Sequence, residues 1–590
     1  MTASSIGEKA TQKLSREELK HVLAVARGDE KADLLIKNVK IIDVVTGQII
    51  PSHIVIAGST IAGFGAEYEN VDALEILEGH GRFVAPGFID SHLHIESSMT
   101  HPFEFERLVL PRGTTTAICD PHEVTNVLGV AGFEWFLRCA ELTTMNLFVE
   151  APSCVPALPG QETQGGNFGL SELLKYRSHS HVLGLAEMMN FPGVIFGHDE
   201  VLDKLDAFNG LSKDGHSPLL RSKELNAYLA AGIKNCHETM LYEEGLEKLQ
   251  KGMSLTIREG TVAKNLKALA PLINEMTSIN CMLCTDDRNP AEIFKEGHID
   301  FLVRALINEH KIPMAIAYRV ASYSAAKHFG LERLGMIAPG KQADILLLSN
   351  PEQVKIDEVI IKGKRVSELK LPETSNEKYQ ISKPPRGNSM KRELVDASDF
   401  SIKFNKGFYN VIEIIPDQIV THHRKVEFDG EKFHGTDVLK IAVVERYGKQ
   451  SPLSLGLVQG FGLKSGALAS SVAHDCHNII VIGTNDEDME IAVNTLITHG
   501  GGFSVVDQGD VKKVLPLPIA GLMSLESAEV LARELGHLRA AYQWQGVNVA
   551  EPFLQMAFLA LPVIPVLKIT DKGLFDVEKF KSVSLQCSGD

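Results

Sequence analysis

The chain has 590 residues, of which 44% are hydrophobic and 23% are charged, a balance typical of a globular protein with several structural units. Its formal net charge of −16 argues against nucleic acids and anionic membranes as partners, because both carry negative charge themselves. The eight cysteines are irregularly spaced and the N-terminus lacks the apolar core of a signal peptide, so we expect a cytoplasmic protein without a disulfide framework.

Two separate segments of similar character predict a small β domain. Residues 16–28 place apolar side chains near one stripe, as in an amphipathic helix, and residues 32–65 then form short β-branched runs broken by Gly, Pro, Asn and Ser. A matching segment appears far downstream, at residues 340–366. We therefore expect one small β-sandwich domain built from both flanks of a middle domain, residues 1–82 and 335–371.

The middle domain, residues 83–334, alternates apolar strands with helical stretches. Eight strands in about 250 residues is the rhythm of an α/β fold of the (β/α)8 TIM-barrel type. The predicted strands are Phe83–Ile89, Thr115–Cys119, Asn146–Ala151, His181–Ala186, Leu211–Asp214, Ile233–Cys236, Met253–Ile257 and Asn280–Cys284. Helices are predicted over Glu200–Phe208, Ser222–Ala231, Glu243–Gln250 and Val262–Glu275.

The end of the chain predicts one more domain. Residues 372–386 are polar and contain prolines, which indicates a linker. Residues 387–590 then read as an additional C-terminal α/β domain, with strands predicted over residues 440–445, 478–483 and 503–506.

The sequence His92-Leu93-His94 follows the first apolar strand of the predicted barrel directly. Side chains two residues apart on a strand point the same way, with Cα atoms about 6.5–7 Å apart, so His92 and His94 can converge on one ion. Neutral imidazoles in this arrangement suit Zn, Fe or Mn. The alternative is two ordinary loop histidines, but Asp90 before them and Glu96 after them favour a metal site.

Polar residues also stand at the ends of other predicted strands, and the strand ends of such a barrel carry its chemistry. Glu187 has two carboxylate oxygens and can bridge two ions, while His216 and His237 can hold the second ion. Asp286 can ligate a metal with one oxygen and move protons with the other. Each of these residues alone could be a buried polar group with satisfied hydrogen bonds. Their joint placement at the strand ends favours a site for two metal ions. Two such ions would ionise a water molecule between them.

Several stretches resemble the amidohydrolase superfamily, and most closely its adenine deaminase family: PGFIDSHLHIESSM, GLAEMMNFPGV, DGHSP, CHET, CTDDRNP and GMIAPGKQADILLL. The resemblance covers essentially the whole chain. It implies a binuclear site for Mn or Fe(II), with Zn as an alternative, adenine as the small-molecule substrate, and a homo-oligomer, namely a dimer. The metal ligands that it implies are His92, His94, Glu187, His216, His237 and Asp286. The bridging position is commonly a carboxylated lysine in the superfamily, and Glu187 in its place favours adenine deaminases over hydantoinase-like and dihydroorotase-like enzymes.

The implied reaction is the hydrolytic deamination of adenine to hypoxanthine and ammonia by a metal-activated hydroxide, in purine salvage. Asp286 would accept a proton and deliver it to the departing amine, and either Glu238 or Glu259 would protonate N1 of the purine. The alternatives are a metal-dependent cyclic amidohydrolase and, from another class, a non-catalytic metal-binding scaffold. Turnover of adenine would separate these three hypotheses.

Five further residues each have two interpretations. Asp120 and His122 could hold a further ion, or support the metal ligands by hydrogen bonds, which we prefer. Arg258 could contact substrate or only form an ion pair at the barrel mouth. Asp475 and His477 come just before a strand of the C-terminal domain, and could close over the active site or only cap a turn.

Overall fold

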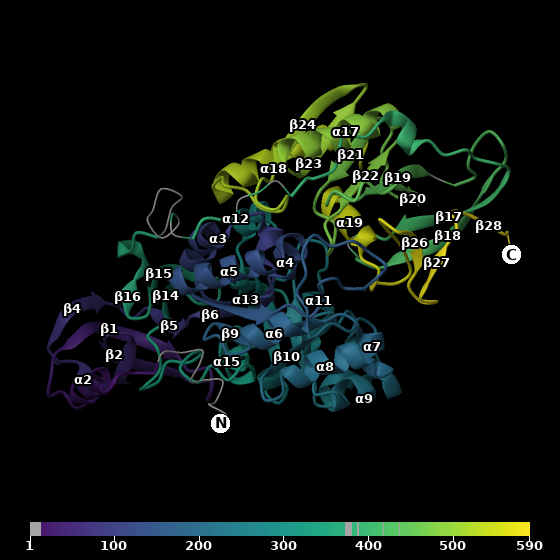
Figure 1. The fold of residues 1–590 in the computed structure, drawn as a ribbon. Coiled ribbons are helices and arrows are strands. Elements are labelled where there is room, and N and C mark those ends of the chain that lie inside the picture. Colours follow the sequence, from purple (N-terminus) through teal and green to yellow (C-terminus); the bar gives the residue numbers. More distant parts are fainter. Residues whose placement is uncertain are drawn as a thin grey trace.

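Three units make up the computed structural model (Figure 1). It describes residues 13–371, 380, 382–385, 387, 389–416, 418–435 and 437–589. The small β unit lies at the lower left of Figure 1, the middle unit beside it and the C-terminal unit above. The predicted linker over residues 372–386 falls largely outside the described residues.

The small β unit is one sheet with the strand order β16-β15-β14-β5-β1-β2-β3, and β4 pairs with β1 off this path. We predicted a small β-sandwich, and its strands are hydrogen-bonded into one continuous sheet because β1 is shared: its first half pairs with β4 and its second half with β5. The helix α2 (Arg16–Arg27) begins after Ser15, whose hydroxyl accepts a hydrogen bond from the Glu18 amide. The strands are β1 (Ala32–Ile42), β2 (Ile49–Ala57), β3 (Thr60–Gly65), β4 (Ala73–Glu78), β5 (Phe83–Pro86), β14 (Ile345–Asn350), β15 (Lys355–Ile361) and β16 (Lys364–Arg365).

The strand predicted over Phe83–Ile89 is two strands. Its first half is β5, which pairs with β14 in the small unit, and its second half begins β6 (Phe88–Leu93) of the middle unit. Gly87 joins them, and a Cβ there would lie 2.2 Å from Oγ1 of Thr115. Only glycine lets the chain pass this close to Thr115 while it leaves one sheet for the other.

The described strands of the middle unit form two parallel sheets, with the orders β10-β9-β8-β7-β6 and β11-β12-β13. Their residues are buried on both faces, which explains their nearly continuous apolar sequences. The remaining strands of these sheets are β7 (Thr114–Cys119), β8 (Asn146–Ala151), β9 (Val182–Met188), β10 (Ser212–Gly215), β11 (Asn235–Cys236), β12 (Ser254–Arg258) and β13 (Cys281–Cys284).

The two parallel sheets meet at both of their edges. At one edge the amide of Asp286 donates to the His92 carbonyl over 3.1 Å, and the His94 amide donates to the Asp286 carbonyl over 3.0 Å. At the other edge a Cβ on Gly215 would lie 2.2 Å from the Asn235 carbonyl oxygen, so β10 and β11 approach closely. These contacts place β6 beside β13 and β10 beside β11.

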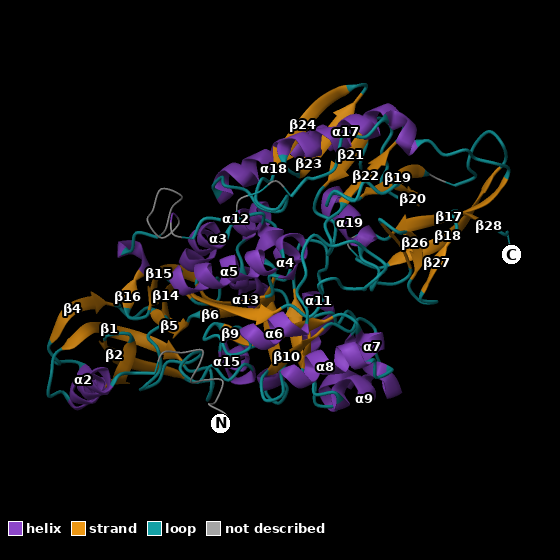
Figure 2. Ribbon diagram, viewed as in Figure 1, coloured by secondary structure: helices purple, strands orange, loops and turns teal. Residues whose placement is uncertain are grey.

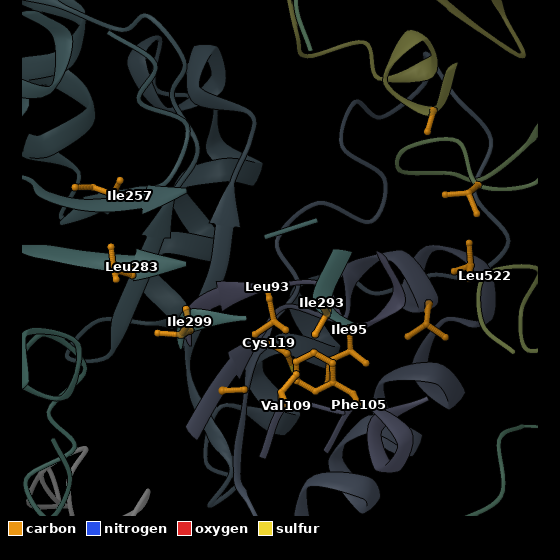
Figure 3. Packing of buried hydrophobic residues seen from close by; sticks show 14 of the residues in the cluster. Leu93, Ile95, Phe105, Val109, Cys119, Ile257, Leu283, Ile293, Ile299 and Leu522 are labelled. Carbon is orange, nitrogen blue, oxygen red and sulfur yellow. The ribbon is translucent and has the colours of Figure 1, made fainter. Parts of the chain in front are cut away.

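Helices lie around these strands (Figure 2). Leu93, Ile257 and Ile299 belong to one buried apolar cluster, which also includes Leu522 of the C-terminal unit (Figure 3). The helices of the middle unit are α3 (Pro102–Val109), α4 (His122–Leu128), α5 (Val130–Leu142), α6 (Leu170–Tyr176), α7 (Phe191–Ile195), α8 (Asp199–Ala207), α9 (Ser222–Ala230), α10 (Tyr242–Gln250), α11 (Leu266–Leu269), α12 (Pro290–Glu296), α13 (Ile299–Asn308), α14 (Met314–Val320) and α15 (Tyr323–His328).

The prediction of one long helix over Val262–Glu275 is wrong. Only α11 and a short 3-10 turn over Ala270–Leu272 form there. Pro271 lacks the amide that an α-helix needs at this point, and it therefore limits the helix to about one turn.

The C-terminal unit contains a nine-stranded sheet with the order β18-β17-β20-β19-β22-β21-β23-β24, to which β28 is added beside β17, and a separate sheet β25-β26-β27. The helix α17 (Asp486–His499) packs on the larger sheet. The other elements are β17 (Gly407–Ile414), β18 (Thr421–Phe428), β19 (Leu439–Val444), β20 (Ser454–Gln459), β21 (Ala467–Ser470), β22 (Ile479–Gly483), β23 (Gly502–Asp507), β24 (Asp510–Pro516), α18 (Ala528–Trp544), α19 (Pro552–Ala557), β25 (Leu567–Thr570), β26 (Gly573–Asp576), β27 (Lys581–Val583) and β28 (Gln586–Cys587).

The C-terminal unit docks on the loops that follow the parallel strands. The amide of Ser524 donates to the Met99 carbonyl over 2.8 Å, and the Thr163 hydroxyl donates to Oδ2 of Asp571 over 2.6 Å. These bonds join regions more than 400 residues apart in the sequence. Within the described part of the chain, no helix is both long and apolar enough to cross a membrane.

Candidate metal centre and active site

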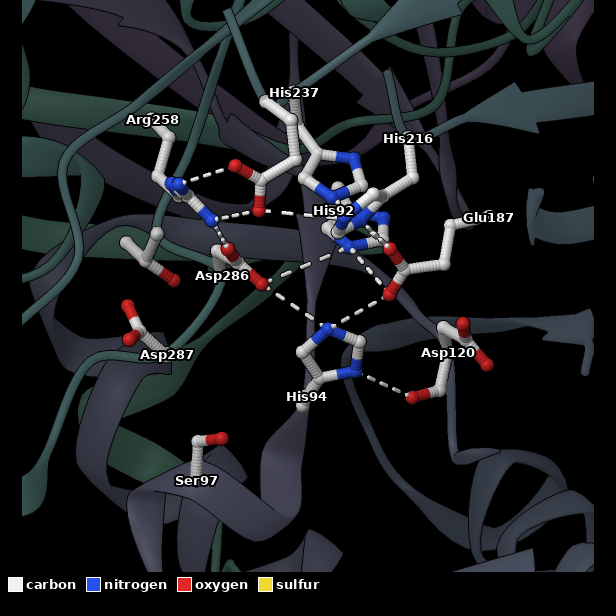
Figure 4. Close-up of polar contacts among 12 residues, drawn as sticks. His92, His94, Ser97, Asp120, Glu187, His216, His237, Arg258, Asp286 and Asp287 are labelled. Atoms are coloured by element: carbon white, nitrogen blue, oxygen red, sulfur yellow. Dashed lines mark hydrogen bonds and ion pairs between the residues drawn. The ribbon is translucent and has the colours of Figure 1, made fainter. Parts of the chain in front are cut away.

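Six predicted ligands come together where the parallel strands end (Figure 4). His94 Nε2 lies 3.1 Å from Oδ1 of Asp286 and 3.3 Å from Oε1 of Glu187. His92 Nε2 lies 3.7 Å from each of the same two oxygens. Glu187 presents its other oxygen, Oε2, to His216 Nδ1 and, at 3.2 Å, to His237 Nε2. The Glu187 carboxylate thus stands between two pairs of histidines, as expected of a bridging residue.

The tautomers of His92 and His94 require a positive charge between their Nε2 atoms and the nearby carboxylate oxygens. Nδ1 of His92 donates to Oδ2 of Asp214 over 2.7 Å, and Nδ1 of His94 donates to the Asp120 carbonyl over 2.9 Å. In the neutral rings the Nε2 atoms therefore carry lone pairs. Those lone pairs point at carboxylate oxygens of Glu187 and Asp286, so a proton or a metal cation must lie between them.

The donor set fits divalent metal ions. Ligand atoms of His92, His94 and Asp286 lie within 4.8 Å of one another, and so do those of His92, Glu187 and His237. His92 Nε2 and His216 Nε2 are buried and have no hydrogen-bond partner among the described residues. Buried nitrogens are rarely left this way unless a ligand takes them. Imidazole and carboxylate ligands together suit Mn, Fe and Zn.

Both carboxylates at the centre are held ionised. Burial alone would raise the pKa of Glu187, but His216 and His237 hold it well below the usual range. Burial would likewise raise the pKa of Asp286, but Arg258 and His94 hold it well below the usual range. Ionised carboxylates are the form that ligates metals and accepts protons.

The backbone of Asp286 is unusual. Its φ is 55°, in the left-handed region that non-glycine residues seldom adopt. Its amide and carbonyl are both fixed by hydrogen bonds to the backbone of His92 and His94. Such strain is maintained only where the surroundings impose it, and here it points the carboxylate at His94.

Arg258 joins two of the candidate catalytic carboxylates. Its guanidinium forms a two-pronged ion pair with Glu238, at 2.5 and 2.7 Å, and also contacts Oδ2 of Asp286. All three residues line the central pocket. Glu259 does not line it, and its carboxylate instead accepts a hydrogen bond from the Leu266 amide over 2.9 Å.

Asp120 and His122 lie beside the ligands and contact each other. His122 Nδ1 lies 2.8 Å from Oδ2 of Asp120 and 3.5 Å from Oε1 of Glu187. On its other side, His122 Nε2 lies 3.5 Å from Oδ1 of Asp475. The C-terminal unit therefore reaches the candidate metal centre through Asp475.

A small pocket opens above the ligands. The middle unit and the C-terminal unit both line it. From the C-terminal unit come His474, Asp475, Phe558 and Leu561. The predicted residue His477 does not line the pocket; its Nδ1 accepts a hydrogen bond from the Ala473 amide over 3.2 Å.

The residues around the site that were not predicted include Asp214, Glu123 and His474. Asp214 could have been found, because it is the last residue of the strand predicted over Leu211–Asp214, just before His216. Glu123 lies directly after His122 but on the first turn of a helix. His474 lies about 350 residues downstream of Glu123, and no sequence spacing links them.

A buried lysine holds the two loops that carry His216 and His237. Lys248 is fully buried, and its Nζ donates to the Ser217 carbonyl over 2.9 Å and to Sγ of Cys236 over 3.4 Å. It also forms an ion pair with Glu244 at 2.7 Å. Because Ser217 and Cys236 are the immediate neighbours of the two histidines, this lysine fixes their backbones relative to each other.

Comparison with known proteins agrees with the geometry. Residues 83–366 match the amidohydrolase family, and residues 418–581 match the adenine deaminase C-terminal domain. An adenine deaminase of Bdellovibrio bacteriovorus is 59% identical over 582 residues, which are 99% of this chain and 99% of that protein. An adenine deaminase of Escherichia coli O157:H7 is 54% identical over 574 residues, 97% of this chain and 98% of that protein.

Proposed function

Because this chain belongs to the adenine deaminase family of amidohydrolases, we propose that it hydrolyses adenine to hypoxanthine and ammonia, in purine salvage. The observation that carries this function is the carboxylate of Glu187 between two pairs of histidines, with Asp286 opposite and a small pocket above. The cyclic amidohydrolase alternative and the silent scaffold are not favoured, because relatives over nearly the full chain are named adenine deaminase.

The family implies a divalent metal, and we propose two ions, with Mn or Fe(II) preferred and Zn as the alternative. His92, His94 and Asp286 would hold one ion, His216 and His237 the other, and Glu187 would bridge them. Bound ions would supply a water of lowered pKa and polarise the substrate. The chemistry of the donor set supports this assignment, as do the imidazole nitrogens without partners.

Asp286 is suited to move the proton of the attacking water. It is ionised, lies against the ligand His94 and lines the pocket, so it can accept a proton and release it to the departing amine. Glu238 is our candidate for protonation of N1, because it lines the pocket and Glu259 does not. Arg258 sits between Glu238 and Asp286 and would hold their orientations.

We further propose that β6 to β13 act as one closed eight-stranded barrel. The parallel bridge between Leu93 and Asp286 and the close approach of Gly215 to Asn235 support closure at the two edges. We also propose a cytoplasmic enzyme, in line with its eight free cysteines, and a dimer. Size-exclusion chromatography with light scattering tests the dimer.

Purified metal-loaded protein tests the reaction directly. Adenine should disappear with equal amounts of hypoxanthine and ammonia formed. If adenine persists while a cyclic amide is hydrolysed, the alternative enzyme class is right and ours is wrong.

A further inference from the structure

His474 belongs to the C-terminal unit but lines the pocket of the candidate active site. It lies in the loop between β21 and β22, and 5% of its surface is exposed. Its ring packs on Phe558, with 4.6 Å between the ring centroids. The same pocket is lined by His94 and Asp286, so a molecule bound there lies between the candidate metal ligands and His474.

Carboxylates surround one nitrogen of His474. Its Nδ1 lies 3.2 Å from Oε1 of Glu123 and 3.8 Å from Oδ1 of Asp475. Ser97 donates a further hydrogen bond to the same oxygen of Glu123, over 3.4 Å. Because ionised carboxylates only accept hydrogen bonds, Nδ1 carries a proton, and two nearby negative charges favour protonation of the second nitrogen as well.

The second nitrogen of His474 has no protein partner. Nε2 is buried and makes no hydrogen bond to any described residue. A buried N–H group left in this way is unfavourable. Since the ring lines the pocket, the missing acceptor is best supplied by the molecule that the pocket binds.

A further metal ion at Glu123, His474 and His477 is a competing explanation, because these residues offer ligand atoms within 4.8 Å of one another. The tautomer of His477 argues against it. Its Nδ1 accepts the amide hydrogen of Ala473, so its Nε2 carries the proton and faces Glu123 at 3.8 Å. A protonated nitrogen cannot bind a cation.

We propose that His474 is a substrate-binding residue that determines specificity: its Nε2–H donates a hydrogen bond to N3 or N7 of the purine ring. This inference rests on the proposed function. Both purine nitrogens carry lone pairs in the plane of the ring, and the apolar side chains of Phe558 and Leu561 offer surfaces for a flat ring. The C-terminal unit then contributes directly to substrate recognition.

The variant His474→Phe keeps a ring against Phe558 and removes the donor. We expect KM for adenine to rise about 10- to 100-fold, the range for one hydrogen bond from a charged group, with kcat changed less than about threefold. The matched control is His423→Phe, the same substitution in β18 of the same unit and outside the pocket lining. It should leave KM unchanged.

Deaza analogues identify the acceptor without a change of shape. Wild-type protein loaded with Mn should bind either 3-deazaadenine or 7-deazaadenine at least about tenfold more weakly than adenine, and His474→Phe should lose that preference. Isothermal titration calorimetry measures this in the Asp286→Asn background, with and without His474→Phe, because the wild-type enzyme would convert adenine during the titration. The proposal is overturned if His474→Phe keeps the wild-type preference for both analogues, or if kcat falls while KM stays the same.

The proposed deamination of adenine and the proposed role of His474 can be refuted independently of each other. Wild-type protein that does not convert adenine would refute the proposed function, while the calorimetric preference would still report on His474. If circular dichroism shows that His474→Phe is unfolded, His474→Gln is the second variant. Its amide can pair with Glu123 or with the purine but not with both, so it should show the same loss of preference in weaker form.

Discussion

Nδ1 of His92 and Oδ2 of Asp214 lie 2.7 Å apart, and both side chains are fully buried. This hydrogen bond turns Nε2 of His92 toward Glu187 and Asp286. A carboxylate behind a histidine ligand fixes the ring and makes it a stronger donor to metal.

The first prediction concerns this pair. Asp214→Asn removes the charge behind His92, and we expect metal affinity to fall about 10- to 100-fold. Competition with a chromogenic chelator measures it. Asp206→Asn, the same substitution at an exposed position of α8, is the control and should bind metal normally. Unchanged affinity in Asp214→Asn would show that the His92 tautomer does not depend on this bond.

The second prediction concerns proton transfer. Asp286→Asn keeps the shape of the side chain but cannot accept a proton, so kcat should fall by about 10²–10⁴. The protein should stay folded and keep much of its metal, because five other candidate ligands remain. Steady-state kinetics with elemental analysis checks both points. Near wild-type kcat would exclude Asp286 as the proton carrier.

The third prediction concerns the bridge. Glu187→Gln places an amide NH2 where an oxygen now faces His94 or the pair His216 and His237, and an amide nitrogen does not ligate. We expect the loss of at least one metal per chain and of deamination. Circular dichroism should be unchanged because the surrounding strands are apolar. Two metals and full activity in this variant would mean that Glu187 is not the bridge.

The fourth prediction concerns acid stability. Nδ1 of His101 accepts the Glu104 amide at the start of α3, and burial lowers the pKa of this histidine to about 4. The unfolded chain binds the proton at about pH 6.5, so the contribution of this residue is complete above that pH and is lost between pH 6.5 and 4. It amounts to about 3 kcal/mol at most.

Urea unfolding at several pH values checks this. His101→Asn supplies an N-cap acceptor that does not titrate. The variant should therefore lose less unfolding free energy than wild type between pH 6.5 and 4. Parallel losses in the two proteins would contradict the assignment.

Much of the centre could be predicted because parallel strands impose an order. His92, His94, Glu187 and Asp286 each follow an apolar run, and the carboxyl ends of those runs meet in space. His474 could not be predicted in this way, since its position depends on how the C-terminal unit docks rather than on any local pattern.

The fold, like the site, could be predicted from the sequence only where a local pattern determines it. The strand over Asn146–Ala151 has the predicted bounds, because its apolar run is continuous. The predicted β-sandwich is a single sheet, because β1 is long enough to pair with β4 at one end and β5 at the other. Pairing between distant segments leaves no periodic signal in either of them.

The most direct test of the metal-dependent mechanism is a titration of chelator-treated protein with Mn, with adenine turnover and bound metal measured at each step. We expect no turnover without metal and a rise to a plateau at two ions per chain, with one ammonia released for each hypoxanthine. Full turnover without bound metal, or a plateau that Glu187→Gln also reaches, would contradict it.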